Sequence, residues 1–350
     1  SNGVPEELVT GKGADADKFA AWAATMGSTI GNPLFHWTHL ELRRYFGIQE
    51  VLGPKTAASI LKQANEQLKK PEFSVRGLLK QMNVRLLATT DDPADDLAHH
   101  SAWAAERAKL VKAGDKLQPM MVPTLRPDKA MNVGDPVAWN AWVDKLSAVA
   151  KREIGSFASL LSVLDDRHKF FHDLGCRLSD HALEVPPAKT ISQAALETAF
   201  SRLKAGTALS GDEAEGFRTA ILLAMARMNR QREWTMQLHI GAIRNLNSKM
   251  FGKLGPDTGY DAINDEPIAK PLARLMDLAE TDGGLPRVIL YTLNPCANEV
   301  LGTIMGAFQD GSSAGKIQFG SAWWFNDQLD GMPVSYTHLA GDSCPASSAC

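Results

Sequence analysis

The chain has little cysteine, no large excess of charge of either sign and no long apolar run. Two of its four cysteines, Cys344 and Cys350, lie in the last seven residues, which leaves no framework for disulfide bonds. The formal net charge of −3 argues against a nucleic-acid surface or a polybasic membrane patch, because both need clustered lysine and arginine. No apolar run approaches membrane-spanning length. These absences favour a cytoplasmic protein with reduced thiols that binds neither nucleic acid nor membrane.

The composition that remains is that of an ordinary globular protein. Hydrophobic residues make up 44% of the chain and charged residues 22%, which supplies enough apolar mass for a core. A chain of 350 residues could form two average domains or one α/β barrel. No internal repeat or low-complexity linker requires a domain boundary.

Short apolar runs alternate with longer segments of helical patterning. We predict strands at 84–90, 119–125, 176–183, 235–243, 288–293 and 317–325. Helical patterning covers 14–25, 38–46, 55–69, 94–113, 136–151, 155–173, 191–232 with a break near Gly206 and Gly211, 266–280 and 297–309. Strands that alternate with helices indicate a parallel sheet. Because no glycine-rich phosphate-binding turn follows the first strand, a barrel is favoured over a dinucleotide-binding sheet.

Several polar residues follow the predicted strands, at the carboxyl ends where parallel α/β enzymes place their active sites. His239 could serve as a general acid or base, a metal ligand or a hydrogen-bond donor, and the alternative is a histidine satisfied by nearby backbone. Asp180 and His181 are adjacent on a strand, so only one can face the interior. We favour Asp180 for that face, with a helix cap as the open alternative. Arg126 is suited to bind a carboxylate with two hydrogen bonds, unless it forms a surface pair with Asp128.

Aromatic residues and further histidines give weaker indications. Of the Trp323 and Trp324 pair, we expect one side chain in the core and one at a sugar pocket. His36 and His39 are one helical turn apart, and we expect a structural role or a place at the rim of the substrate site. The glycine-containing segment after His239 is expected to form an irregular loop that covers the site.

Two further residue pairs have structural interpretations. Asp91 and Asp92 are expected to cap a helix, and His99 and His100 to lie on a solvated helix face. Together these residues predict a barrel enzyme that acts on a polar, anionic small molecule. A non-catalytic module that binds sugar acids is the alternative from another class.

Long motifs in consistent order resemble the bacterial uronate isomerase family of the amidohydrolase superfamily. The runs are IGNPLFHWTHLELRR at 30–44, TTDDP at 89–93, RPDKA at 126–130, SDHAL at 179–183, LHIGA at 238–242, NEVLGT at 298–303 and WWFNDQ at 323–328. The resemblance covers essentially residues 1–332. It implies a distorted (β/α)8 barrel with a helical insertion over about residues 1–80, and a homo-oligomeric enzyme.

The resemblance also implies a reaction and its site. The family interconverts D-glucuronate with D-fructuronate and D-galacturonate with D-tagaturonate in hexuronate catabolism, through an enediol-like intermediate. Carried over by motif, Arg126, Asp180 and His239 would act in catalysis. Arg126, Trp323, Trp324, His36 and His39 would contact the uronate. The runner-up activity is that of an amidohydrolase-type metal-dependent hydrolase, and the remaining alternative is a uronate-binding module without turnover.

The family's metal-binding motifs are expected outside this chain. A His-x-His pair on the first strand and an Asp-Ser-Arg run on the last hold a divalent metal, usually zinc, in the family. They would precede Ser1 and follow Met332, so the chain would hold strands two to seven of eight. We therefore expect no bound metal and no isomerisation by the 350-residue chain. Residues 333–350 resemble a translated sequencing adapter, and we expect a non-native tail there.

Overall fold

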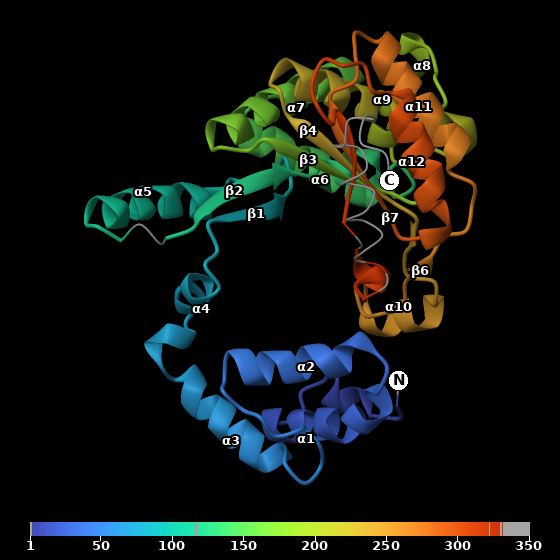
Figure 1. Cartoon of the computed structure of the whole chain (residues 1–350). Helices are drawn as coiled ribbons and strands as arrows, with labels where there is room; N and C mark the ends of the chain where they lie inside the picture. The colour runs from blue at the N-terminus through green and yellow to red at the C-terminus, as the bar shows by residue number, and fades with distance from the viewer. Residues whose placement is uncertain (1, 116–117, 322, 330, 332–350) are drawn as a thin grey trace, which may run out of the picture. The chain divides into compact units, whose positions relative to one another are not determined.

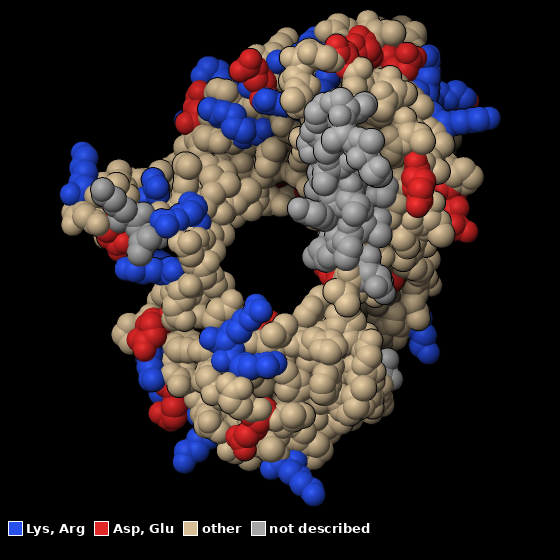
Figure 2. Space-filling view, viewed as in Figure 1, with Lys and Arg blue, Asp and Glu red and all other residues tan. Residues whose placement is uncertain are grey.

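The computed structural model describes residues 2–115, 118–321, 323–329 and 331. The chain divides into two compact units, which are described one at a time. The first comprises residues 1–85 and 107–120, and the second comprises 86–106 and 121–350 (Figure 1). Every helix in the described ranges is too short or too polar to cross a membrane. On the surfaces that Figure 2 shows, basic and acidic side chains are interspersed with wide neutral areas.

The first unit is helical. Its α-helices are α1 (Asp15–Thr25), α2 (Pro33–Arg44), α3 (Ala57–Leu68) and α4 (Val75–Gln81). The first three and the segments that connect them form a small core of Ala23, Met26, Leu42, Ile48, Leu52, Ala57 and Ile60. Helix α2 starts five residues before the predicted 38, because the Asn32 side chain accepts the Leu34 N–H at 3.0 Å and Pro33 occupies the first turn. The helix at 75–81 was not predicted, and Ser74 caps it.

The second unit is built on a six-stranded sheet, in which the neighbouring pairs β2–β3, β3–β4, β4–β7 and β7–β8 are parallel. The strands, in spatial order, are β1 (Leu86–Asp91), β2 (Met120–Leu125), β3 (Leu178–Leu183), β4 (Thr235–Ile240), β7 (Arg287–Thr292) and β8 (Ile317–Phe319). The prediction of a parallel α/β fold is confirmed. Within the described residues β1 and β8 do not pair with each other, so the sheet is not closed into a barrel.

Helices cover one face of this sheet (Figure 1). They are α5 (Ala98–Lys112), of which residues 98–106 belong to this unit, α6 (Pro136–Ala150), α7 (Phe157–Asp173), α8 (Gln193–Lys204), α9 (Gly211–Gln231), α11 (Ala269–Thr281) and α12 (Asn298–Ala307). The main core lies between these helices and the sheet, and includes Trp139 packed edge-on against Phe200 and Phe217. The predicted break in the segment 191–232 is confirmed, because Gly206 adopts φ 85° between α8 and α9.

The predicted strand 235–243 ends early, at Ile240. Gly241 has φ 97°, a conformation that interrupts the strand. Ala242 and Ile243 then form β5, which pairs antiparallel with β6 (Ala262–Ile263). Between them lies the short helix α10 (Ser248–Leu254), so the segment expected to be an irregular loop contains a helix and a two-stranded sheet.

Three other local predictions were wrong. Strand β8 ends at Phe319 instead of 325, and Trp324, with φ 56°, begins a 3₁₀ turn, Trp324–Asn326. Strand β3 begins at Leu178, so Cys176 precedes it. His100 is buried instead of solvated, because it lies against β1 with its Nε2 at 2.7 Å from Thr89 Oγ1.

A buried chain of polar groups connects β3 to the helices behind the sheet. His168 Nε2 and Asn229 Oδ1 are 3.0 Å apart, the Asn229 amide donates to Ser179 Oγ at 2.7 Å, and Ser179 Oγ lies 2.9 Å from His181 Nε2. The Nδ1 atoms of both histidines are buried without a partner among the described residues. His168 also stacks on Trp234, with ring centroids 3.6 Å apart. An imidazolium at either position would have no acceptor for its extra proton, so both rings are neutral.

This chain of histidines should make stability depend on pH. Burial lowers the pKa of His168 and of His181 from 6.5 to about 4. Between these values the folded protein binds fewer protons than the unfolded chain, so stability falls as the pH falls from 6.5 toward 4. We expect each histidine to remove about 2 kcal/mol from the free energy of unfolding between pH 7.5 and pH 5.

Denaturant unfolding at several pH values tests this expectation. His181→Gln should reduce the acid-dependent loss by about 2 kcal/mol, whereas His99→Gln, at an exposed position, should leave it unchanged. Equal pH slopes in wild type and His181→Gln would contradict the assignment.

Candidate active site

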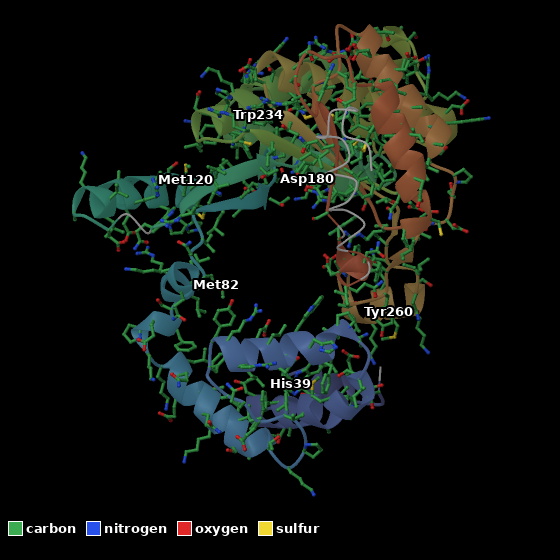
Figure 3. The ribbon with its side chains drawn as sticks, in the orientation of Figure 1. His39, Met82, Met120, Asp180, Trp234 and Tyr260 are labelled. Carbon is green, nitrogen blue, oxygen red and sulfur yellow. The ribbon has the colours of Figure 1, made fainter. Side chains whose placement is uncertain are left out.

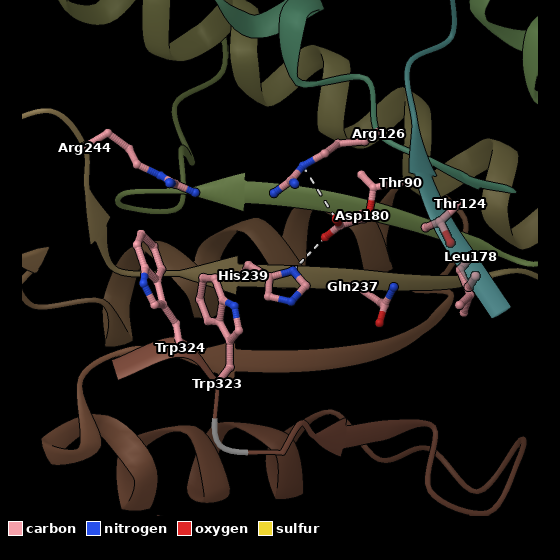
Figure 4. A pocket seen from close by; sticks show the side chains of 11 residues that line it. Thr90, Thr124, Arg126, Leu178, Asp180, Gln237, His239, Arg244, Trp323 and Trp324 are labelled. Atoms are coloured by element: carbon pink, nitrogen blue, oxygen red, sulfur yellow. Dashed lines mark hydrogen bonds and ion pairs between the residues drawn. The ribbon is translucent and has the colours of Figure 1, made fainter. Parts of the chain in front are cut away.

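A pocket of about 520 Å³ opens on the face of the sheet opposite the helices (Figure 4). Alternate residues along each strand line it, since successive strand side chains point to opposite faces. The lining residues are Ala88 and Thr90 of β1, Thr124 and Arg126 at the end of β2, Leu178 and Asp180 of β3, Gln237 and His239 of β4, and Arg244, Trp323 and Trp324 from the connecting segments.

Asp180 and His239 form a close pair at the centre of the pocket. The Nδ1 atom of His239 donates to Asp180 Oδ1 over 2.6 Å (Figure 4). Burial raises the pKa of Asp180, but the hydrogen bond from His239 and the charges of His239 and Arg126 outweigh burial and bring it below its usual range. Asp180 is therefore a carboxylate at neutral pH. His239 Nε2 makes no hydrogen bond with the described residues, so it is available to a bound molecule.

The adjacent pair Asp180 and His181 divides between the two faces of β3, as strand geometry requires. Asp180 lines the pocket and His181 is fully buried on the helix side. Among the described residues Asp180 caps no helix, and its carboxylate lies against His239 and Arg126.

Arg126 joins this pair to a second carboxylate. Its Nε atom lies 2.9 Å from Asp128 Oδ2 and 3.5 Å from Asp180 Oδ2. The pair with Asp128 that was the alternative interpretation of Arg126 is thus present, and it forms beside the pocket. In the described ranges, the two terminal nitrogens of Arg126 have no hydrogen-bond partner, and Figure 4 shows that end of the side chain reaching over the pocket.

Tyr291 of β7 supports the ring of His239, a contact that the sequence reasoning missed. The two rings are stacked, with centroids 4.3 Å apart and an interplanar angle of 9°. The Tyr291 hydroxyl donates to Gln237 Oε1 over 3.1 Å. At Gly320 a Cβ atom would come within 2.2 Å of the Tyr291 ring, so the absence of a side chain at 320 makes room for the ring. Because side chains alternate between the two faces along a strand, Gln237, two residues before His239, could have been predicted to line the same pocket.

Both tryptophans line the pocket, so the expectation that one would lie in the core was wrong. Trp323 and Trp324 are in a turn after β8, where the alternation of a strand does not apply. The Trp323 ring lies edge-on to His239 at 4.6 Å. The guanidinium of Arg244, a residue that was not predicted, lies 4.6 Å from the centre of the Trp324 ring and pairs with Asp261 at 3.0 Å.

His36 and His39 lie on α2 of the first unit, where Figure 3 labels His39, and neither residue is among those that line the pocket of the second unit. The ring of His39 is engaged within its own unit. Its Nδ1 donates to the Phe35 carbonyl at 2.6 Å and its Nε2 accepts the Leu52 N–H at 3.0 Å. His36 is exposed. A role for either residue in binding substrate stays a prediction.

The described residues do not fit a metal centre. In this part of the chain no three histidine, cysteine, aspartate or glutamate side chains are arranged to hold a metal ion. The divalent metal implied by the family resemblance stays an expectation.

Comparison with known proteins gives consistent results. A family model for glucuronate isomerase matches residues 1–344. The uronate isomerase of Yersinia enterocolitica is 48% identical over 341 residues, which cover 97% of this chain and 71% of that protein. The uronate isomerase of Phocaeicola vulgatus is 47% identical over 341 residues, which also cover 97% of this chain and 71% of that protein.

Solved structures agree with these sequence matches. The crystal structure of uronate isomerase from Thermotoga maritima aligns with a TM-score of 0.84 at 32% identity, covering 97% of this chain and 71% of that one. Glucuronate isomerase from Caulobacter crescentus also has a TM-score of 0.84, and at 23% identity it supports the fold alone.

A parallel α/β fold with a hydrogen-bonded histidine–aspartate pair and two arginines in one pocket is typical of enzymes that act on small polar molecules. Within that class, the chain belongs to the glucuronate isomerase family, and it is an isomerase. The family resemblance read from the motifs is confirmed.

The contact between Gly320 and Tyr291 predicts the effect of one methyl group. Gly320→Ala should displace the Tyr291 ring and lower the free energy of unfolding by about 1–3 kcal/mol, the usual range for overpacking. Denaturant unfolding measures this loss, and near-ultraviolet circular dichroism reports the displaced ring.

Gly306→Ala is the matched control. Gly306 lies in α12, and nothing would lie within 4 Å of an added Cβ there. This change should leave stability the same or raise it slightly, because alanine favours a helix over glycine. Equal effects of the two substitutions would contradict the packing described for Tyr291.

Proposed function

We propose that this isomerase interconverts aldose and ketose forms of uronates, D-glucuronate with D-fructuronate and D-galacturonate with D-tagaturonate, in hexuronate catabolism. The observation that carries the proposal is the pocket in which Asp180, His239 and Arg126 converge. The names of the similar proteins support the substrate class. The proposal includes a distorted (β/α)8 barrel as the architecture to which the six strands belong. A cytoplasmic location and homo-oligomeric assembly stay predictions.

Two arginines and two tryptophans would bind the sugar acid. The terminal nitrogens of Arg126 can form two parallel hydrogen bonds with the uronate carboxylate. Arg244 adds positive charge at the same pocket, although Asp261 and Asp257 partly neutralise it. Trp323 and Trp324 offer ring faces and edges to the apolar C–H groups of the sugar. This set of groups would favour a uronate over a neutral hexose.

His239 and Asp180 would move the proton. Nε2 of His239 accepts the proton from C2 of the aldose, the C–H electron pair forms the C1–C2 double bond, and the carbonyl electron pair moves onto the C1 oxygen, which takes the proton of the C2 hydroxyl to give an enediol-like intermediate. The C2 oxygen then re-forms a carbonyl as the C1–C2 double-bond electrons take the proton back from His239 Nε2 at C1, which gives the ketose and the neutral imidazole. Asp180 holds the Nδ1–H of His239 and stabilises the imidazolium that forms between the two transfers.

Conversion of the sugars themselves tests this function. We expect the protein expressed from its complete gene to convert D-glucuronate to a ketose, detected by chromatography or by proton exchange at C2 in deuterated water. His239→Asn should lower kcat by at least about 100-fold, the contribution typical of a general base. His99→Asn, at an exposed position outside this pocket, should leave kcat unchanged.

Two results would contradict the proposal. Binding of D-glucuronate measured by calorimetry without turnover would favour a uronate-binding module, and hydrolysis of an amide or ester without isomerisation would favour a hydrolase. The same assay on the 350-residue chain tests the separate expectation that this chain does not isomerise uronates by itself.

A further inference from the structure

Asp128 occupies an unusual position between two pockets. Its Oδ2 atom accepts a hydrogen bond from Arg126 Nε at 2.9 Å and another from the Ala182 N–H, at the end of β3, at 3.1 Å. Its Oδ1 atom is buried and has no hydrogen-bond partner among the described residues. Asp128 also lines a second pocket together with Glu184 and Arg218. The carboxylate is therefore held from one side and directed at Arg126.

Arg126 has two carboxylates in reach of one nitrogen. Asp128 Oδ2 lies 2.9 Å from Nε and Asp180 Oδ2 lies 3.5 Å from the same atom. A guanidinium in contact with a single carboxylate tends to form two parallel hydrogen bonds with it, which would use a terminal nitrogen. The pair with Asp128 engages Nε alone and leaves both terminal nitrogens without a protein partner in the described ranges. That is the arrangement a bidentate contact with a ligand carboxylate requires.

We infer that Asp128 is a positioning residue for uronate binding, which orients Arg126 and keeps its guanidinium from turning to Asp180. The inference rests on the proposed function, because it takes the uronate carboxylate as the ligand of Arg126. Without a charge at 128, the nearest carboxylate to the guanidinium is Asp180. Arg126 would then compete with His239 for Asp180, and the affinity for uronate would fall.

The charge on Asp128 changes in an accessible pH range. Burial raises the pKa of Asp128 to about 6, and the charge and hydrogen bonds of Arg126, together with the Ala182 N–H, only partly oppose this. The other charged groups around it are Asp180, which raises its pKa further, and Glu184 and Arg218 in the second pocket. Lys129, next in the chain, pairs with Asp92 at 3.1 Å. Lowering the pH from 7.5 to 5 should therefore neutralise Asp128 in the folded protein.

Calorimetric titration of the 350-residue chain with D-glucuronate at pH 7.5 and pH 5 tests the inference, because this experiment measures binding and does not require turnover. At pH 7.5 we expect Asp128→Asn to raise Kd on the order of tenfold, the scale of one charge-assisted hydrogen bond. At pH 5 the ratio of the two Kd values should approach one, because both proteins then carry a neutral side chain at 128. Taking the ratio removes the pH dependence that any other group contributes equally to both proteins.

Two controls separate orientation of Arg126 from a general effect. In an Arg126→Lys background, Asp128→Asn should cause little further loss, because lysine has no guanidinium plane to orient. Asp166→Asn, which removes the exposed partner of Arg152, should leave the Kd for glucuronate unchanged. This double-mutant cycle also keeps the test valid if Asp128→Asn lowers stability.

The outcomes distinguish the two levels of the proposal. A Kd ratio that is the same at both pH values, or an equal loss in the Arg126→Lys background, contradicts the role of Asp128 while uronate binding stands. Failure of the wild-type chain to bind D-glucuronate at pH 7.5 contradicts the proposed function and the inference with it.

Discussion

The register of three adjacent parallel strands determines what this protein presents to a ligand. Asp180 of β3 pairs with Gln237 of β4, and His239 of β4 pairs with Tyr291 of β7. Because side chains alternate between the two faces of a sheet, this register places all four on the pocket side and gives Met236, Leu238 and Ile240 to the core. A slip of one residue in β4 would bury His239 and expose leucine in its place. The Asp180–His239 pair, the Tyr291 ring that supports it and the core behind it are consequences of one register.

Two carboxylates, those of Asp180 and Asp128, share the single guanidinium of Arg126. Asp180 accepts from His239 and contacts Arg126, while Asp128 holds the same guanidinium from the other side. One arginine thus stabilises two partly buried carboxylates, and each carboxylate limits how the arginine can turn. In an environment of low dielectric constant such interactions are stronger than at an exposed surface. The arrangement keeps Asp180 ionised beside the histidine and leaves the outer edge of the guanidinium for a ligand.

Histidines on the two faces of the sheet, on β3 and β4, have different surroundings. On the helix side, His181, Ser179, Asn229 and His168 form a neutral hydrogen-bonded chain that is sealed from solvent. On the pocket side, His239 keeps one ring nitrogen for a bound molecule. Turns complete the pocket: Gly241 ends β4 and leads to Arg244, and the short β8 brings Trp323 and Trp324 over the site. Membership of the glucuronate isomerase family is consistent with the proposal that this pocket receives an anionic sugar.

The sequence by itself determined the parallel α/β class and most helices and strands, because apolar periodicity is a local feature. It also placed Arg126, Asp180 and His239 at the carboxyl ends of strands, where parallel α/β folds gather their site residues. Alternation along a strand also predicted that the side chains of Asp180 and His181 lie on opposite faces of the sheet. Only the tertiary structure decided that Asp128 and Asp180 share Arg126, that Tyr291 stacks on His239 against Gly320, and that Arg244 and both tryptophans reach the pocket. It also showed His100 buried against β1. These contacts join residues from separate strands and turns, and local periodicity contains no information on which strands are neighbours or how a turn aims its side chains.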